Sequence, residues 1–70
     1  MIEEKELDNR FTYHKPTGNQ PDRYENIRKQ ARDFVNAIIL QTPESREQSL
    51  ALTKIEEAVF WANASIARRE

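Results

Sequence analysis

The longest regular pattern of apolar positions runs through the last third of the chain, from residue 43 to residue 69. Apolar side chains recur there at three- and four-residue steps, at Leu52, Ile55, Val59, Ala62 and Ile66. This spacing places side chains on one face of an α-helix. Other apolar residues, among them Phe60 and Trp61, fall outside that face. The pattern predicts a long helix with more apolar surface than one neighbouring helix covers.

Two residues are candidates for the N-terminal cap of this helix. Ser45, followed three residues later by Gln48, matches the capping-box pattern of a helix N-terminus. Thr42, which precedes Pro43, is the competing cap. The sequence leaves both starting points open.

A second apolar stripe predicts another long helix over residues 21–41. Proline at position 21 suits the first helical position, where its missing N–H is not needed. The link to the next helix is only a few residues long, so the two helices should fold back on each other as an antiparallel hairpin. The stripe consists of Tyr24, Ile27, Ala31, Phe34, Val35, Ile38 and Ile39.

Residues 1–20 differ from the rest of the chain. The charged stretch at residues 2–10 has a glutamate-rich start that suits a short helix, which would be marginal without docking. Residues 11–14 alternate aromatic and polar side chains, which indicates an extended stretch, and a turn with the only glycine, Gly18, follows Lys15-Pro16. We therefore expect an all-α fold in a single domain of residues 1–70: a short N-terminal helix or arm, then a two-helix hairpin.

The length of the chain favours self-association. A single core in 70 residues rarely supplies more than about 3–5 kcal/mol of stability. There is no cysteine for a disulfide or a thiolate–metal site, and one histidine excludes a multi-histidine metal site. We therefore expect a homo-oligomer, with Phe60, Trp61 and Ala64 at the interface between subunits. The small side chain of Ala64 and its neighbouring alanines would let helices approach closely.

Charge and hydropathy narrow the classes of partner. The net charge is −1 although 33% of the residues are charged, which argues against binding duplex nucleic acid. No apolar run has the length of a membrane span, and the acidic N-terminal stretch does not resemble a signal peptide. The expected location is therefore the cytosol, and a few local cations could still hold a small anion.

The sequence offers no catalytic constellation. It has neither a Ser/His/Asp arrangement nor a glycine-rich phosphate loop. The adjacent carboxylates of Glu3-Glu4 and Glu56-Glu57 would diverge on a helix, as solvated surface residues do. We expect no enzyme activity, no catalytic residue, no metal and no cofactor.

The segment from Arg10 to Lys15 is the strongest candidate for ligand binding. It combines the aromatic rings of Phe11 and Tyr13 with the basic groups of Arg10, His14 and Lys15. Aromatic faces stack on nucleobases, and nearby cations hold phosphates. The simpler interpretation is that the two rings pack the N-terminal arm onto the hairpin.

Two pairs of basic residues on the predicted helices could likewise have either a structural role or a role in phosphate binding. Arg68 and Arg69 would either cap the C-terminal end of a helix dipole or clamp a phosphate with their guanidinium groups. Arg28 and Lys29 are of the kind that usually lies on the solvated side of a helix.

Three stretches of the chain, RFTYHKP, PDRYENIRKQA and PESREQSLALTKIEEAVFWANASIAR, resemble the phage anti-CBASS sponge family of cyclic-oligonucleotide-binding hairpin proteins. The resemblance covers residues 9–69. It implies a small helical protein that assembles into hexamers and binds cyclic dinucleotides and cyclic trinucleotides without cleaving them. It also implies that the protein acts in the cytoplasm of the infected bacterial host, where it keeps these messengers from antiviral effectors.

The same resemblance implies roles for individual residues. Tyr13 matches the aromatic residue that stacks on a base. Arg28, with Lys29 as its neighbour, matches a basic residue that contacts phosphate, and the C-terminal arginine of the family matches either Arg68 or Arg69.

The symmetry expected of a homo-oligomer supports the binding of cyclic nucleotides without reference to the family. A two-fold interface presents the same loop twice, which suits a cyclic dinucleotide with its two phosphates, and a three-fold axis suits a cyclic trinucleotide. A hypothesis of a different class remains open. In it, the chain is a structural or adaptor hairpin that binds a protein through the surface of Phe60 and Trp61.

Overall fold

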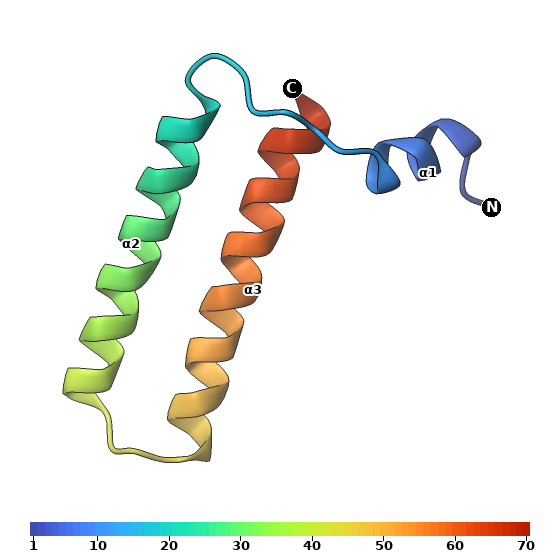
Figure 1. The fold of residues 1–70 in the computed structure, drawn as a ribbon. Helices are drawn as coiled ribbons and strands as arrows, with labels where there is room; N and C mark the ends of the chain where they lie inside the picture. Colours follow the sequence, from blue (N-terminus) through green and yellow to red (C-terminus); the bar gives the residue numbers. More distant parts are fainter.

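The computed structural model describes residues 1–70 and contains three helices, α1 (Glu4–Phe11), α2 (Gln20–Gln41) and α3 (Arg46–Arg69) (Figure 1). The helices α2 and α3 run antiparallel, side by side. The short helix α1 lies to the side of the C-terminal part of α3, away from α2, and the segment that joins α1 to α2 crosses α3 near its C-terminal end (Figure 1). The predicted all-α hairpin is confirmed.

Helix α2 ends where its sequence stops supporting helical geometry. Thr42 has extended backbone angles, φ −127° and ψ 151°, as expected of a residue before proline. Its side-chain hydroxyl donates a hydrogen bond of 2.7 Å to the Ile38 carbonyl, and its backbone N–H donates to the same oxygen. Thr42 therefore closes α2 instead of opening α3, and the helix spans Gln20–Gln41, one residue more than predicted.

The structure also decides where α3 begins. The Ser45 hydroxyl accepts a hydrogen bond of 3.1 Å from the Gln48 backbone N–H, so Ser45 is the cap. Only half of the capping box forms, because the Gln48 side chain donates to the Thr42 carbonyl and hydroxyl at 3.2 and 3.0 Å instead of returning to Ser45. The helix begins at Arg46, three residues inside the range 43–69, so of the two starting points that the sequence leaves open the structure selects Ser45.

The N-terminal helix α1 ends one residue later than the sequence pattern indicates. Phe11 is the last residue of α1, so the non-helical stretch begins at Thr12 and not at Phe11. The predicted turn is present, and Gly18 has φ 55°, a left-handed conformation that favours glycine. Residues 12–19 form the segment between α1 and α2, called here the crossing loop.

The molecule is a single layer of helices. Its principal extents are 45 × 32 × 13 Å, and the smallest is close to the diameter of about 10–12 Å of one helix with its side chains. Its radius of gyration is 15.5 Å, against about 11 Å for a compact chain of this length. No residue is buried, because the apolar stripes of α2 and α3 meet along one seam only. The apolar residues outside the seam stay exposed.

None of the three helices combines the length and the apolar composition that crossing a membrane requires.

Candidate functional site

A groove of about 570 Å³ lies where the crossing loop passes the ends of α2 and α3. Its volume falls in the range of small-molecule sites, about 300–1,000 Å³. Residues of α1, the crossing loop, α2 and α3 all contribute to its lining, and we call it the basic groove. The lining consists of Arg10, Thr12, Tyr13, His14, Pro16, Tyr24, Arg28, Asn63, Ala64, Ala67 and Arg68.

Helical spacing explains how the long helices contribute to the basic groove. Tyr24 and Arg28 are four residues apart on α2 and therefore share one face. On α3, Ala64 and Arg68 have the same spacing, and Ala67 lies beside them. The small side chains of the alanines leave the space above the helix open. Ala64, which was predicted at the subunit interface, lines this groove.

The basic groove is positively charged although the chain as a whole is slightly acidic. Three guanidinium groups line it, those of Arg10, Arg28 and Arg68, and no carboxylate is among its lining residues. Arg28 and Arg68 form no side-chain ion pair, whereas the Arg10 Nε lies 3.4 Å from the Glu6 carboxylate. Guanidinium groups in this arrangement suit phosphate oxygens, which they bind in a bidentate manner.

Tyr13 presents its ring to the solvent side of this groove. The residue is 82% exposed, and Phe11 is 85% exposed. The interpretation in which both rings pack the arm onto the hairpin is therefore wrong. An exposed ring beside guanidinium groups is the combination that proteins use to stack a base and hold its phosphate.

His14 ties the crossing loop to α1. Its Nε2 lies 2.7 Å from the Asn9 carbonyl oxygen, and because a carbonyl only accepts, Nε2 carries the hydrogen. The Asn9 carboxamide in turn donates a hydrogen bond of 3.1 Å to the Arg68 carbonyl. His14 and Asn9 thus hold the start of the loop against the last turn of α3.

The two C-terminal arginines have different surroundings. Arg68 lines the basic groove, whereas Arg69 lies outside it and binds Glu6 through both guanidinium nitrogens, at 3.0 and 2.7 Å. These hydrogen bonds from Arg69, assisted by Arg10, lower the pKa of the Glu6 carboxyl to about 2. The structure therefore favours Arg68 over Arg69 as the arginine that faces this groove.

Two predicted ligand residues lie outside the basic groove. Lys29 points to Asp33, with 3.9 Å between Nζ and the carboxylate, and both side chains are largely exposed. Lys15 is exposed in the crossing loop and is not among the lining residues. The groove brings together Arg10, Tyr13, His14, Arg28 and Arg68 from the predicted set.

The sequence interpretation missed Asn63. Its side-chain oxygen is enclosed and has no hydrogen-bond partner, and the residue lines the basic groove. Buried polar groups in folded proteins are normally hydrogen-bonded, so this unpaired acceptor is unusual. The signal in the sequence is a lone carboxamide between two alanines, Ala62 and Ala64.

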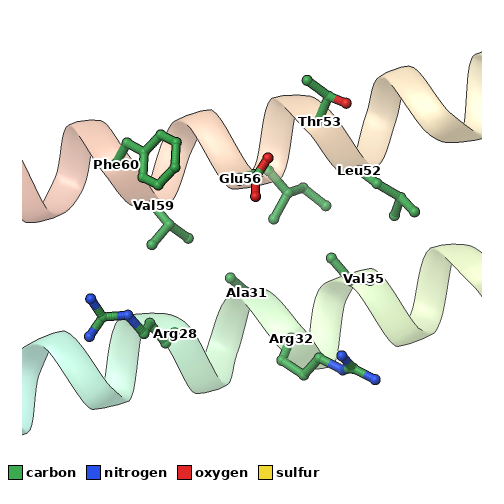
Figure 2. Close-up of a pocket in the computed structure, with 10 residues that line it drawn as sticks. Arg28, Ala31, Arg32, Val35, Leu52, Thr53, Glu56, Val59 and Phe60 are labelled. Carbon is green, nitrogen blue, oxygen red and sulfur yellow. The ribbon is translucent and has the colours of Figure 1, made fainter.

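A second groove, of about 430 Å³, runs between α2 and α3 on one face of the hairpin (Figure 2). We call it the apolar groove. Val35, Leu52 and Val59 project into the space between the helices, and the charged side chains of Arg32 and Glu56 flank it (Figure 2). Neither charged side chain forms an ion pair.

Phe60 and Trp61 do not form one surface. Phe60 is 63% exposed and lines the apolar groove, whereas Trp61 is 68% exposed and lines a separate recess with Phe11 and Arg10. Successive helical residues point about 100° apart, which explains the division. The single surface predicted from these two neighbours is therefore two surfaces.

Comparison with known proteins identifies a family. The protein family described as "Acb2/Tad1, hairpin domain" matches residues 3–67. No curated protein matches the chain, and no solved structure matches it.

Proposed function

The chain belongs to the Acb2/Tad1 hairpin family, the anti-CBASS sponge family, and from this premise we propose that it sequesters cyclic oligonucleotide messengers. The ligands would be cyclic dinucleotides and cyclic trinucleotides, bound without cleavage. The place of action would be the cytoplasm of an infected bacterial host, where sequestration would block CBASS signalling.

The observation that carries the proposal is the composition of the basic groove. An exposed tyrosine ring and three guanidinium groups line one open space that no carboxylate lines. Each charge-assisted hydrogen bond to a phosphate contributes about 1.5–3 kcal/mol, and each stacked base about 1–3 kcal/mol. A few such contacts are sufficient for tight binding of a small anionic ring.

We further propose that the functional form is a homo-oligomer, a hexamer by analogy with the family. A layer one helix thick with no buried residue leaves the apolar groove and Trp61 in water, which favours association. Arg28 lines both the basic groove and the apolar groove. Packing of two copies through the apolar groove would therefore bring two sets of phosphate-binding groups close to each other.

Binding without chemistry agrees with the groups present. His14 is the one imidazole in the basic groove, and its Nε2 is already engaged by the Asn9 carbonyl. No carboxylate lines the groove to act beside it as a general base. The ligand should therefore leave the protein unchanged.

Calorimetry with a panel of cyclic di- and trinucleotides tests the proposal. Tyr13→Ala should weaken binding by about 10–100-fold because it removes a stacking contact. Tyr13→Phe, which keeps the ring, is the matched control and should bind like the wild type.

The outcomes of this titration are decisive. If the wild type binds no member of the panel, the proposal is wrong. Linear products recovered after denaturation would show cleavage in place of sequestration.

An adaptor hairpin remains the alternative because Phe60 and the apolar groove form an exposed apolar surface. In that case the protein should be monomeric and Phe60→Asp should abolish capture of a protein partner. Under the sponge proposal, the same substitution should dissociate the oligomer.

A further inference from the structure

Several side chains converge on the Glu70 carboxylate at the end of α3. The two terminal nitrogens of Arg23 donate to its two oxygens, one at 2.7 Å, and the Gln20 carboxamide donates to it at 3.0 Å. The Arg23 Nε also donates to the Asn19 side-chain oxygen at 3.1 Å. We call Glu70, Arg23 and Gln20 the C-terminal clamp. It joins the first turn of α2 to Glu70, the residue that follows α3.

The clamp extends into the crossing loop. The side-chain oxygen of Gln20 accepts a hydrogen bond of 3.0 Å from the Thr17 backbone N–H, and the Thr17 hydroxyl lies 3.4 Å from the same oxygen. Gln20 therefore uses one end of its carboxamide to bind Glu70 and the other end to bind the loop.

The crossing loop is consequently anchored on both sides of Tyr13. Before Tyr13, the Asn9 carboxamide binds the Arg68 carbonyl, and after it the clamp binds Thr17. The first anchor binds the last turn of α3, the end of the helix that the loop crosses (Figure 1), and the second reaches Glu70, which follows that turn, through Gln20. The ring of Tyr13 is mostly in water, so packing of its own side chain does not fix its place.

We infer that Glu70 is a positioning residue, which acts through Gln20 and Arg23 to hold the crossing loop in the shape that binds ligand. None of these three residues lines the basic groove, so their effect on binding would be indirect. A loop that is ordered before binding loses less conformational freedom on binding, which raises the affinity. The inference rests on the proposed function and deepens it.

Binding and amide hydrogen exchange of two variants test the inference together. Glu70→Ala should lower the affinity for a cyclic dinucleotide by about tenfold. It should also speed hydrogen exchange at the Thr17 amide, because Gln20 loses the partner that holds it in place. The matched control is Glu57→Ala, which removes an ion pair of 3.1 Å with Lys54 elsewhere on α3 and should change neither quantity.

A double-mutant cycle separates positioning from a general loss of stability. If Glu70 acts through Gln20, Gln20→Ala and Glu70→Ala should show coupled effects, and the double variant should bind little more weakly than Gln20→Ala alone. Fully additive losses would overturn the inference. Glu57→Ala should leave both the affinity and the Thr17 exchange unchanged, even where its unfolding temperature falls.

Failure of this inference is distinguishable from failure of the proposed function. Wild-type affinity in Glu70→Ala, or unchanged exchange at Thr17, overturns the positioning role while the sponge function stands. If the wild type binds none of the nucleotides, both the positioning role and the sponge function are wrong. Hydrogen exchange at Thr17 then reports only whether the clamp holds the loop.

Discussion

At the scale of single residues, the site depends on which of several similar cations faces the basic groove. Arg28 and Lys29 are neighbours of equal charge, but only Arg28 is among the lining residues, and Lys29 points to Asp33. Arg68 and Arg69 differ in the same way, because Glu6 binds Arg69. A helix turns about 100° per residue, so neighbours in sequence face different surroundings.

Arg28→Ala should therefore weaken binding of a cyclic dinucleotide by about 10–100-fold, through the loss of a charge-assisted contact to phosphate. Lys29→Ala, measured by the same calorimetry, should bind within about twofold of the wild type. Equal losses in the two variants would indicate that overall charge, and not the position of one guanidinium, holds the ligand.

Much of the fold could be predicted from the sequence, and the site only in part. The apolar stripes and Pro21 predicted the hairpin because these signals are local. The choice between Thr42 and Ser45 was not predictable, since it depends on where the Gln48 side chain goes. The grouping of Tyr13 with Arg28 and Arg68 depends on the path of the crossing loop over α3, which no local pattern specifies.

At the scale of elements, hydrogen bonds and ion pairs attach the end of α3 to its neighbours. Ser45 caps the start of this helix, and Glu70 and Arg69 tie its end to α2 and to α1. The carboxyl groups in these ties have depressed pKa values. Hydrogen bonds from Arg69 lower the pKa of Glu6 to about 2, and hydrogen bonds from Arg23 lower that of Glu70 to about 2.

The assignment of Ser45 as the cap of α3 predicts how its loss changes the stability of the protein. Ser45→Ala leaves the Gln48 backbone N–H without its acceptor and should lower the free energy of unfolding by about 1 kcal/mol in urea titrations. Ser49→Ala, at an exposed position of the same helix, is the control and should change stability little. A cap variant as stable as the control would contradict the assigned start of α3.

The depressed carboxyl pKa values predict how stability depends on pH. Glu6 and Glu70 titrate near pH 2 in the folded protein and near 4.5 when unpaired, so the unfolded chain binds more protons between these values. The stability that they contribute is complete above about pH 4.5 and is lost as the pH falls toward 2.

Circular dichroism of thermal unfolding between pH 6 and pH 2.5 measures this loss. The double variant Glu6→Gln/Glu70→Gln should be less stable than the wild type at pH 6. Between pH 6 and pH 2.5 it should lose less stability than the wild type does. Parallel curves for the two proteins would show that these ion pairs do not persist in solution.

At the scale of the whole molecule, the chain lacks a second layer to cover its hairpin. The apolar groove is flanked by Arg32 on α2 and by Glu56 on α3, at similar heights in an antiparallel pair (Figure 2). A two-fold axis parallel to the helices would place α2 of one copy over α3 of the other. Each Arg32 would then face a Glu56, in the self-complementary manner of an isologous interface.

Charge reversal tests this arrangement. Arg32→Glu and Glu56→Arg should each shift the protein toward smaller species in light scattering, because like charges would then face each other across the apolar groove. The double variant should restore the wild-type mass, since the pairs re-form with opposite sign. A double variant that dissociates as far as each single variant would place the interface on another face.

The central claim is that several copies of this chain together hold an intact cyclic nucleotide. Native mass spectrometry of the wild type mixed with a cyclic dinucleotide tests it in one measurement. The predicted result is an oligomer whose mass includes the unmodified nucleotide, and this added mass should be lost in Tyr13→Ala while the oligomer remains. A single chain of unchanged mass, with the nucleotide free in solution, would contradict the claim.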